Sequence, residues 1–290
     1  MLQTRLATTP AYGTYPLTPR QRVIRALFHD TVLGLARIRR PFIRWFWDGV
    51  CTPVDATLFG LRVRFHPHDN QTDEKGAVCG SAYNARELKW IRRALRPGDV
   101  FLDIGANMGF FSLFAASRGA HVVAIEPNPV LQARLLANFG FNRLPVTLIP
   151  EAVGEAHRAV EIVRQNADLG SATVAPSETA RIAMSPLLDH VREAGLSGID
   201  ILKIDIEGYE DRALLPFFRD APAHLFPRLI IIEHATDPGR RQALQDGLIG
   251  SGLYRQRART RANALLERCD PLPSASLRQG ADEQLLQFTA

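Results

Sequence analysis

The chain has 290 residues, of which 46% are hydrophobic and 22% charged, as in a globular protein with a full core. No stretch reaches the roughly 18 consecutive apolar residues of a membrane span. The three cysteines are scattered, so they predict neither a disulfide framework nor a zinc site. We therefore expect a reducing, cytoplasmic setting. The net charge of +5 resides in residues 1–50, which carry eight Arg and two Asp, so no basic groove for nucleic acid is indicated elsewhere.

Residues 1–96 are predicted to form a tail, a basic amphipathic helix and a cap region. Apolar residues recur every three or four positions from Ile24 to Ile38 among many arginines, and an aromatic cluster follows at Trp45–Trp47. This composition is typical of a helix that lies on an anionic membrane surface or a protein partner, and also of a helix packed over a neighbouring domain. A short strand is expected at Leu61–Phe65 and a helix at Glu87–Leu95.

Residues 97–270 alternate buried strands with helices, which predicts an α/β fold with a mostly parallel sheet covered on both faces. Residues 151–185 are expected to form a loop-rich insertion with one short strand near 160–163, and residues 271–290 a polar tail. The expected parallel strands are Val100–Ile104, His121–Ile125, Val146–Ile149, Ile199–Ile204 and Leu229–Ile232. The strands Leu253–Arg257 and Asn263–Leu266 are expected to close the sheet as an antiparallel hairpin.

The first of these strands runs into the turn Asp103-Ile-Gly-Ala-Asn-Met-Gly109. Gly105 and Gly109 would let the backbone approach a ligand closely. The spacing is not the G-x-G-x-x-G fingerprint of dinucleotide enzymes. The carboxylate of Asp103 suits a ligand with an ammonium group better than one with phosphates, which favours S-adenosylmethionine over NAD.

Glu126 ends the second strand, 23 residues after Asp103. An acid near this spacing can accept hydrogen bonds from both ribose hydroxyls of a nucleoside cofactor. NAD enzymes share the feature, so Glu126 supports a nucleoside cofactor without distinguishing the two.

The runs DVFLDIGANMGFFSLFAA, VVAIEPNP, LIPEAVGE, DILKIDIEGYE and LIIIEH resemble the FkbM family of S-adenosylmethionine-dependent methyltransferases in order and spacing. The resemblance covers roughly residues 97–268 and implies a Rossmann-like class I methyltransferase sheet, here with an N-terminal helical and strand extension. It implies methylation of a hydroxyl group on a sugar, glycan or small natural product. Carried over residue by residue, the cofactor positions implied by the resemblance are Asp103, Gly105, Asn107, Gly109, Glu126, Asn128 and, near the adenine, Ala152.

Polar residues that follow two later strands are the candidates for catalysis. Asp205 and Glu207 follow one strand, and Glu233 and His234 follow the next, so three carboxylates and an imidazole could converge at one edge of the sheet. Asp205, Glu207 and His234 are the predicted catalytic residues. His234, or Asp205 directly, could take the proton of a hydroxyl acceptor, and the paired carboxylates could instead hold a divalent metal ion.

Two other functional classes remain open on these residues alone. A dinucleotide-dependent oxidoreductase would need the glycine fingerprint that this turn lacks. A non-catalytic binding module on a methyltransferase-like fold would be expected to have lost Asp103 or the glycines, and both are present.

Overall fold

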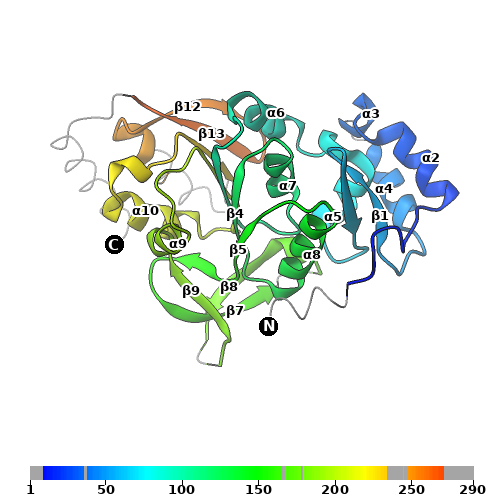
Figure 1. Ribbon diagram of the computed structural model, residues 1–290, viewed down its shortest axis with the longest axis horizontal. Coiled ribbons are helices and arrows are strands. Elements are labelled where there is room, and N and C mark those ends of the chain that lie inside the picture. The colour runs from blue at the N-terminus through cyan, green and yellow to red at the C-terminus, as the bar shows by residue number, and fades with distance from the viewer. Residues whose placement is uncertain are drawn as a thin grey trace.

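A seven-stranded sheet lies at the centre of the protein (Figure 1). The computed structural model describes residues 9–35, 38–164, 167–177, 179–233, 244 and 247–270. The strand order is β12-β13-β11-β10-β3-β4-β5. Its strands are β3 (Val100–Ile104), β4 (His121–Ile125), β5 (Thr147–Ile149), β10 (Ile201–Ile204), β11 (Leu229–Glu233), β12 (Tyr254–Arg259) and β13 (Asn263–Arg268).

Only β13 runs against the direction of the other strands of this sheet. It pairs antiparallel with β11 on one side and with β12 on the other, whereas β11, β10, β3, β4 and β5 pair in parallel. The predicted mostly parallel sheet with a closing antiparallel hairpin is confirmed. The carboxyl ends of the parallel strands therefore meet at one edge, where ligands of such sheets bind.

Alternate residues along each strand face opposite sides of the sheet and enter two separate cores. Phe101 packs with α6 (Ala85–Ala94), α7 (Phe110–Ala116) and α8 (Pro129–Gly140). Leu102 packs with α9 (Leu187–Glu193) and α10 (Glu210–Asp220). Burial on both faces explains why these strands consist of continuous apolar runs in the sequence.

The strand expected near 160–163 is confirmed, as part of the strand Arg158–Arg164. The rest of the insertion was expected to be rich in loops but forms a second sheet, so that part of the prediction is wrong. Four strands pair in the order β6-β9-β7-β8, below the main sheet in Figure 1. Most residues of its strands are half-buried or exposed, so these strands lack the buried runs that mark the central strands. They are β6 (Ala152–Gly154), β7 (Arg158–Arg164), β8 (Ala172–Pro176) and β9 (Ile182–Pro186).

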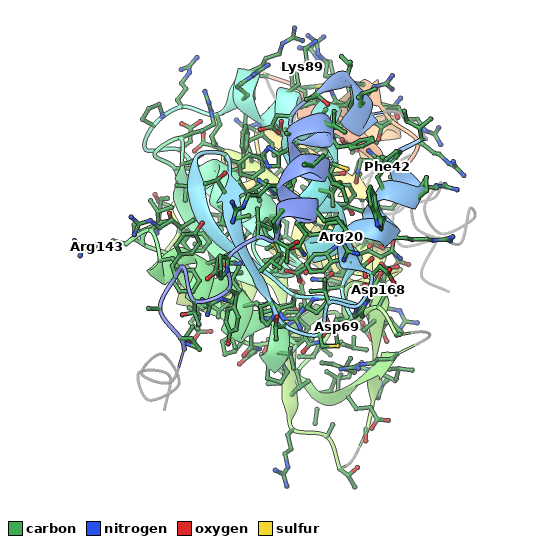
Figure 2. All side chains as sticks on the ribbon, turned by 90° about the vertical axis from the view of Figure 1, so that its right-hand side faces the viewer. Arg20, Phe42, Asp69, Lys89, Arg143 and Asp168 are labelled. Atoms are coloured by element: carbon green, nitrogen blue, oxygen red, sulfur yellow. The ribbon has the colours of Figure 1, made fainter. Side chains whose placement is uncertain are left out.

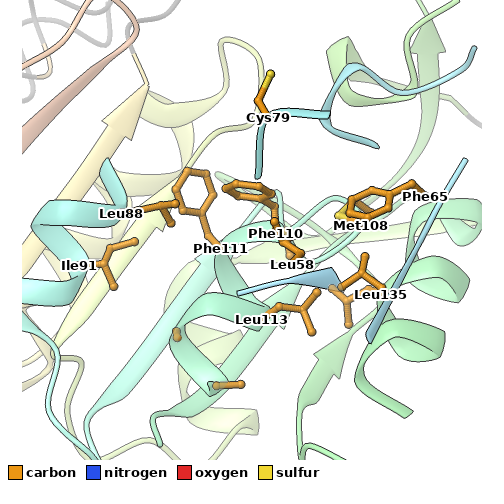
Figure 3. Close-up of a cluster of buried hydrophobic side chains, with 14 of the residues drawn as sticks. Leu58, Phe65, Cys79, Leu88, Ile91, Met108, Phe110, Phe111, Leu113 and Leu135 are labelled. Atoms are coloured by element: carbon orange, nitrogen blue, oxygen red, sulfur yellow. The ribbon is translucent and has the colours of Figure 1, made fainter. Parts of the chain in front are cut away.

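Residues 9–96, here called the N-terminal cap, pack on the core that also holds α7. Figure 3 shows Leu58, Phe65 and Cys79 of the cap among Met108, Phe110 and Phe111. The cap contains a two-stranded antiparallel sheet as well as helices. Its elements are α2 (Pro19–Phe28), α3 (Val32–Leu35), α4 (Arg39–Trp47), β1 (Val54–Leu58), β2 (Leu61–Phe65), α5 (Gln71–Cys79) and α6.

The amphipathic pattern from Ile24 to Ile38 is not one helix, contrary to the prediction. The helix ends at Phe28, and Asp30 adopts a left-handed φ of 58°. Its side chain accepts a hydrogen bond from the backbone N–H of Ser81 at 2.6 Å. This turn folds the chain back over the end of α5. Within the described residues, no helix is both long enough and apolar enough to cross a membrane.

Candidate active site

A pocket opens where the carboxyl ends of β3, β4 and β10 meet; we call it the strand-end pocket. Loops that follow these strands line it, and β6 and β8 of the second sheet close its far side. The predicted ligand residues among its lining are Gly105, Asn107, Glu126, Ala152, Asp205 and Glu207.

Gly105 is required where two of these loops touch. A Cβ built on it would lie 2.0 Å from the backbone oxygen of Asp205, and its φ is +74°. Gly109 has a φ of 91° and starts α7, but it does not line the pocket. The two glycines of the motif therefore have different structural roles. Gly105 allows the two loops to contact each other, and Gly109 forms the turn that leads into α7.

Glu126 lines the strand-end pocket, and two backbone amides hold its carboxylate. The N–H groups of Asn107 and Asn128 donate to its two oxygens at 2.8 and 2.9 Å. Burial raises the pKa of Glu126 to about 7, although both amide bonds oppose this. Each oxygen keeps acceptor capacity for a ligand hydroxyl.

The asparagines predicted beside Glu126 have structural roles in the same loops. Asn107 exchanges hydrogen bonds with Asn70 of the cap and lines the pocket. Asn128 caps α8 by accepting from the N–H of Val130 at 3.0 Å, and it does not line the pocket. A ligand role for Asn128 remains a prediction.

Asp103 lies behind the pocket. Its side chain is buried, accepts a hydrogen bond from the Ser112 hydroxyl at 2.6 Å and lies 3.8 Å from the Lys203 ammonium. Burial raises the pKa of Asp103, while Lys203 opposes this shift. It lines neither pocket described here, so a direct contact with an ammonium group of the cofactor remains a prediction.

A second pocket of about 250 Å³ lies beside the first, between the N-terminal cap and the sheet; we call it the cap pocket. The cap contributes polar side chains and a tyrosine, and the sheet contributes a lysine and acids. Gly105, Asn107, Gly170, Asp205 and Glu207 line both pockets, so the two share a wall. The cap residues are Gln71, Thr72, Lys75, Tyr83 and Asn84.

The second sheet closes over the cap at the rim of the cap pocket. Asp69 and Asp168 lie side by side there (Figure 2), and the N–H of Leu169 donates to the backbone oxygen of Asp69 at 2.7 Å. The Asp168 carboxylate accepts from the N–H of Gln71 at 3.1 Å. Asp69 in turn accepts from Arg134 on α8 at 2.6 Å, which fixes the cap to the sheet domain.

Three carboxylates converge at the cap pocket, and two of them, those of Asp205 and Glu207, belong to residues of the shared wall. One oxygen from each of Asp205, Glu207 and Glu233 lies within 4.8 Å of the others. The Lys203 ammonium donates to Asp205 at 3.2 Å. The carboxylates predicted to meet at this edge of the sheet therefore do so.

The three acids have different proton affinities. Burial and the charge of Asp205 raise the pKa of Glu233 to about 10. Glu233 therefore stays protonated at neutral pH and donates a hydrogen bond to Asp205. Burial opposes ionisation of Asp205, but Lys203 and that hydrogen bond lower its pKa below the usual range. Burial, followed by the charge of Asp205, raises the pKa of Glu207 to about 7.

Glu207 differs from Asp205 and Glu233 in its backbone conformation. Its backbone φ is +54°, an uncommon value for a residue with a side chain, and it lines both pockets. Its pKa near 7 suits proton exchange at neutral pH. His234, the third predicted catalytic residue, lies outside the described residues.

Sequence reasoning did not assign a role to Lys203 or to the polar residues of the cap pocket. Lys203 was detectable, because it is the one charged residue inside the apolar run Ile201–Ile204, and a buried charge must be paired. Nothing in the sequence indicated that Lys75 and Tyr83 would lie opposite it, since they are more than 100 residues away.

A family model described as the methyltransferase FkbM domain matches residues 103–263, more than half of the chain. The chain belongs to the FkbM methyltransferase family. The matched part is an S-adenosylmethionine-dependent methyltransferase domain. The match begins at Asp103 and ends at Asn263. It therefore contains every residue that lines the strand-end pocket and leaves out the N-terminal cap.

Two relatives have names that state a function. The chain is 29% identical over 240 residues to the AMB antimetabolite synthetase AmbE of Pseudomonas aeruginosa, covering 67% of this chain and 11% of AmbE. It is 32% identical over 155 residues to the 31-O-demethyl-FK506 methyltransferase FkbM of Streptomyces tacrolimicus, covering 41% of this chain and 60% of that protein.

Among solved structures, the tRNA (uracil-54, C5)-methyltransferase of Pyrococcus abyssi in complex with S-adenosyl-L-homocysteine has a TM-score of 0.43 at 14% identity. The match covers 74% of this chain and 44% of that one. The chain thus spans less than two thirds of each of these three proteins.

Proposed function

We propose that the protein methylates a hydroxyl group of a sugar, a glycan or a small natural product, with S-adenosylmethionine as the methyl donor. The observation that carries the proposal is the shared wall between the two pockets. One pocket has the features of a nucleoside-cofactor site, the other is polar, and Glu207 lines both.

The residues of the strand-end pocket fit the cofactor. Glu126 offers two acceptor oxygens that are already fixed by backbone amides, which suits a ribose diol. Ala152 is small and buried in the opposite wall, where it leaves room for a flat base. When bound, S-adenosylmethionine supplies an electrophilic methyl group.

Glu207 is the proposed general base. An alcohol is a poor nucleophile until its proton is removed, and the ionised Glu207 carboxylate would accept that proton. Asp205 accepts hydrogen bonds from Lys203 and from protonated Glu233. These bonds fix the position of Asp205 in the wall that the two pockets share. A positioned base contributes typically 10²- to 10⁴-fold to the rate.

The lining of the cap pocket supports a polyhydroxylated acceptor. Side chains of Gln71, Asn84 and Lys75 can exchange hydrogen bonds with hydroxyl groups, and the rings of Phe110 and Phe111 offer an apolar surface for a sugar ring. Negative charge repels a nucleic-acid phosphate backbone, and the same lining holds four acids, of which only Glu233 keeps its proton at neutral pH as a result of its raised pKa. They are Asp168, Asp205, Glu207 and Glu233.

Transfer of a labelled methyl group tests the proposal. Purified protein would be incubated with S-adenosylmethionine labelled in its methyl group and, in separate reactions, with extracted glycans, small metabolites and total RNA. We expect label in an O-methyl group of a glycan or metabolite. Label in RNA would show that the acceptor is RNA and not a glycan or metabolite. Cofactor binding without label in any fraction would favour a non-catalytic binding module.

A further inference from the structure

Three helices of the N-terminal cap, here called the arm helices, form its outer layer: α2, α3 and α4 (Figure 1). Their inner side is already packed, since Ile24, Phe28 and Phe46 are buried in the core. Their outer side is apolar as well, because six large apolar side chains are between 47% and 79% exposed. These are Val23, Leu27, Val32, Leu35, Ile38 and Trp45.

The exposed apolar residues are held in fixed positions. Thr18 and Gln21 form a capping box at the start of α2, and the Arg25 guanidinium donates to the backbone oxygens of Ala77 and Thr57. The ring of Phe42 joins Phe28 of the core to exposed Trp45, with centroid distances of 4.6 and 6.5 Å. The apolar surface is therefore presented by a rigid layer that has already folded onto the core.

Positive charge accompanies this surface. Arg22, Arg40 and Arg44 are exposed, and neither Arg40 nor Arg44 has a carboxylate partner in the part of the chain that the structure describes. The two acids of the layer are engaged elsewhere: Asp30 bonds to Ser81, and Asp48 lies 3.9 Å from Arg20. Figure 2 shows Arg20 and Phe42 on the face formed by this layer.

We propose that the arm helices dock on an anionic lipid bilayer. Apolar side chains beside unpaired arginines are the composition of an interfacial helix, whose apolar face enters the boundary between headgroups and acyl chains. The arginines would bind the lipid phosphates, which a neutral protein partner would not require. The arm packs on α5, whose residues Gln71, Thr72 and Lys75 line the cap pocket, so docking brings that pocket next to the membrane.

Vesicle co-sedimentation of the full chain tests the proposal. We expect binding to vesicles of phosphatidylcholine that contain about 30 mol% phosphatidylglycerol, and little binding to vesicles of pure phosphatidylcholine. The binding should weaken as the salt concentration rises. Each basic residue near an anionic surface adds about fivefold to binding, so Arg40→Gln with Arg44→Gln should lower the partition coefficient about 25-fold. Trp45→Ser should weaken binding as well, because it removes apolar area.

Matched controls are available on exposed positions outside the arm. Arg92→Gln with Arg93→Gln on α6 changes the same charge, and Val130→Ser on α8 removes an exposed apolar side chain; each should change binding less than twofold. Equal losses in the arm and control variants would overturn the proposal, as would an absence of vesicle binding by the unaltered protein. A dimer in light scattering that Trp45→Ser converts to a monomer, without vesicle binding, would assign the surface to a second copy instead.

Discussion

The backbone oxygen of Asp205 lies against Gly105 so closely that any Cβ at this position would stand 2.0 Å away. The turn that follows β3 and the turn that follows β10 are thereby locked together. Both pockets share this contact in their common wall. The geometry of the site thus requires glycine at position 105, where any side chain would collide with the Asp205 backbone.

Gly105→Ala should open this contact and displace the loop that carries Asn107. We expect cofactor affinity to fall at least tenfold and the protein to be destabilised, because the φ of +74° is also strained for alanine. Calorimetric titration and thermal melting measure the two effects. Gly140→Ala is the control: it lies in α8 with no heavy atom near its Cβ position, so it should stabilise slightly. Equal cofactor affinity in both variants would contradict this account of the wall.

Glu126→Gln should weaken binding of S-adenosylmethionine by about ten- to a hundredfold, because the charge-assisted acceptor is lost. The pKa near 7 adds a pH effect. Ionised Glu126 accepts from both hydroxyls, so affinity should rise as the pH rises through about 7, and the variant should lack this rise. Glu161→Gln, on the exposed side of β7, serves as control. An unchanged affinity in folded Glu126→Gln would show that the cofactor binds elsewhere.

Lys203→Met should destabilise the fold, because it leaves Asp103 buried without its cation. Breaking a buried pair in this way costs about 3–5 kcal/mol, or a drop in Tm of roughly 10 °C for a domain of this size. Adding Asp103→Asn to the variant should recover part of the loss. The exposed Lys89→Met gives the baseline in the same melting experiment. Similar Tm values for the two lysine variants would mean that the buried pair contributes little.

A chelator should leave the rate of methyl transfer unchanged. The Lys203 ammonium and the proton that Glu233 retains already offset part of the negative charge of the acidic cluster, which weakens its attraction for a divalent ion. The assay is label transfer with and without EDTA. Loss of activity that added Mg²⁺ restores would instead assign the three carboxylates to a metal ion.

The parallel sheet could be predicted because burial on both faces leaves a signal in each strand, as the runs at Val100–Ile104 and Leu229–Glu233 demonstrate. The pocket residues at strand ends followed from the same reasoning, as for Glu126. The second sheet could not be predicted, since half-exposed strands such as β8 lack that signal.

Long-range contacts set a second limit on prediction. The pairing of Asn70 with Asn107 depends on tertiary packing and has no local pattern. The break after Phe28 depends equally on a distant partner, because Asp30 is held by Ser81. Local periodicity therefore located the helical surface and its apolar face but not the turn that divides it.

The pH dependence of single-turnover methyl transfer in the Glu207→Gln variant tests the central claim most directly. Glu207 must be ionised to act as a base, so the rate of the unaltered protein should rise with pH around its pKa of about 7 and level off above it. Glu207→Gln should lower the rate at pH 8 by 10²- to 10⁴-fold and remove this rise, with cofactor affinity nearly unchanged, whereas the exposed control Glu193→Gln should match the unaltered protein. A Glu207→Gln protein that transfers methyl groups at the normal rate and with the same pH profile would contradict the account.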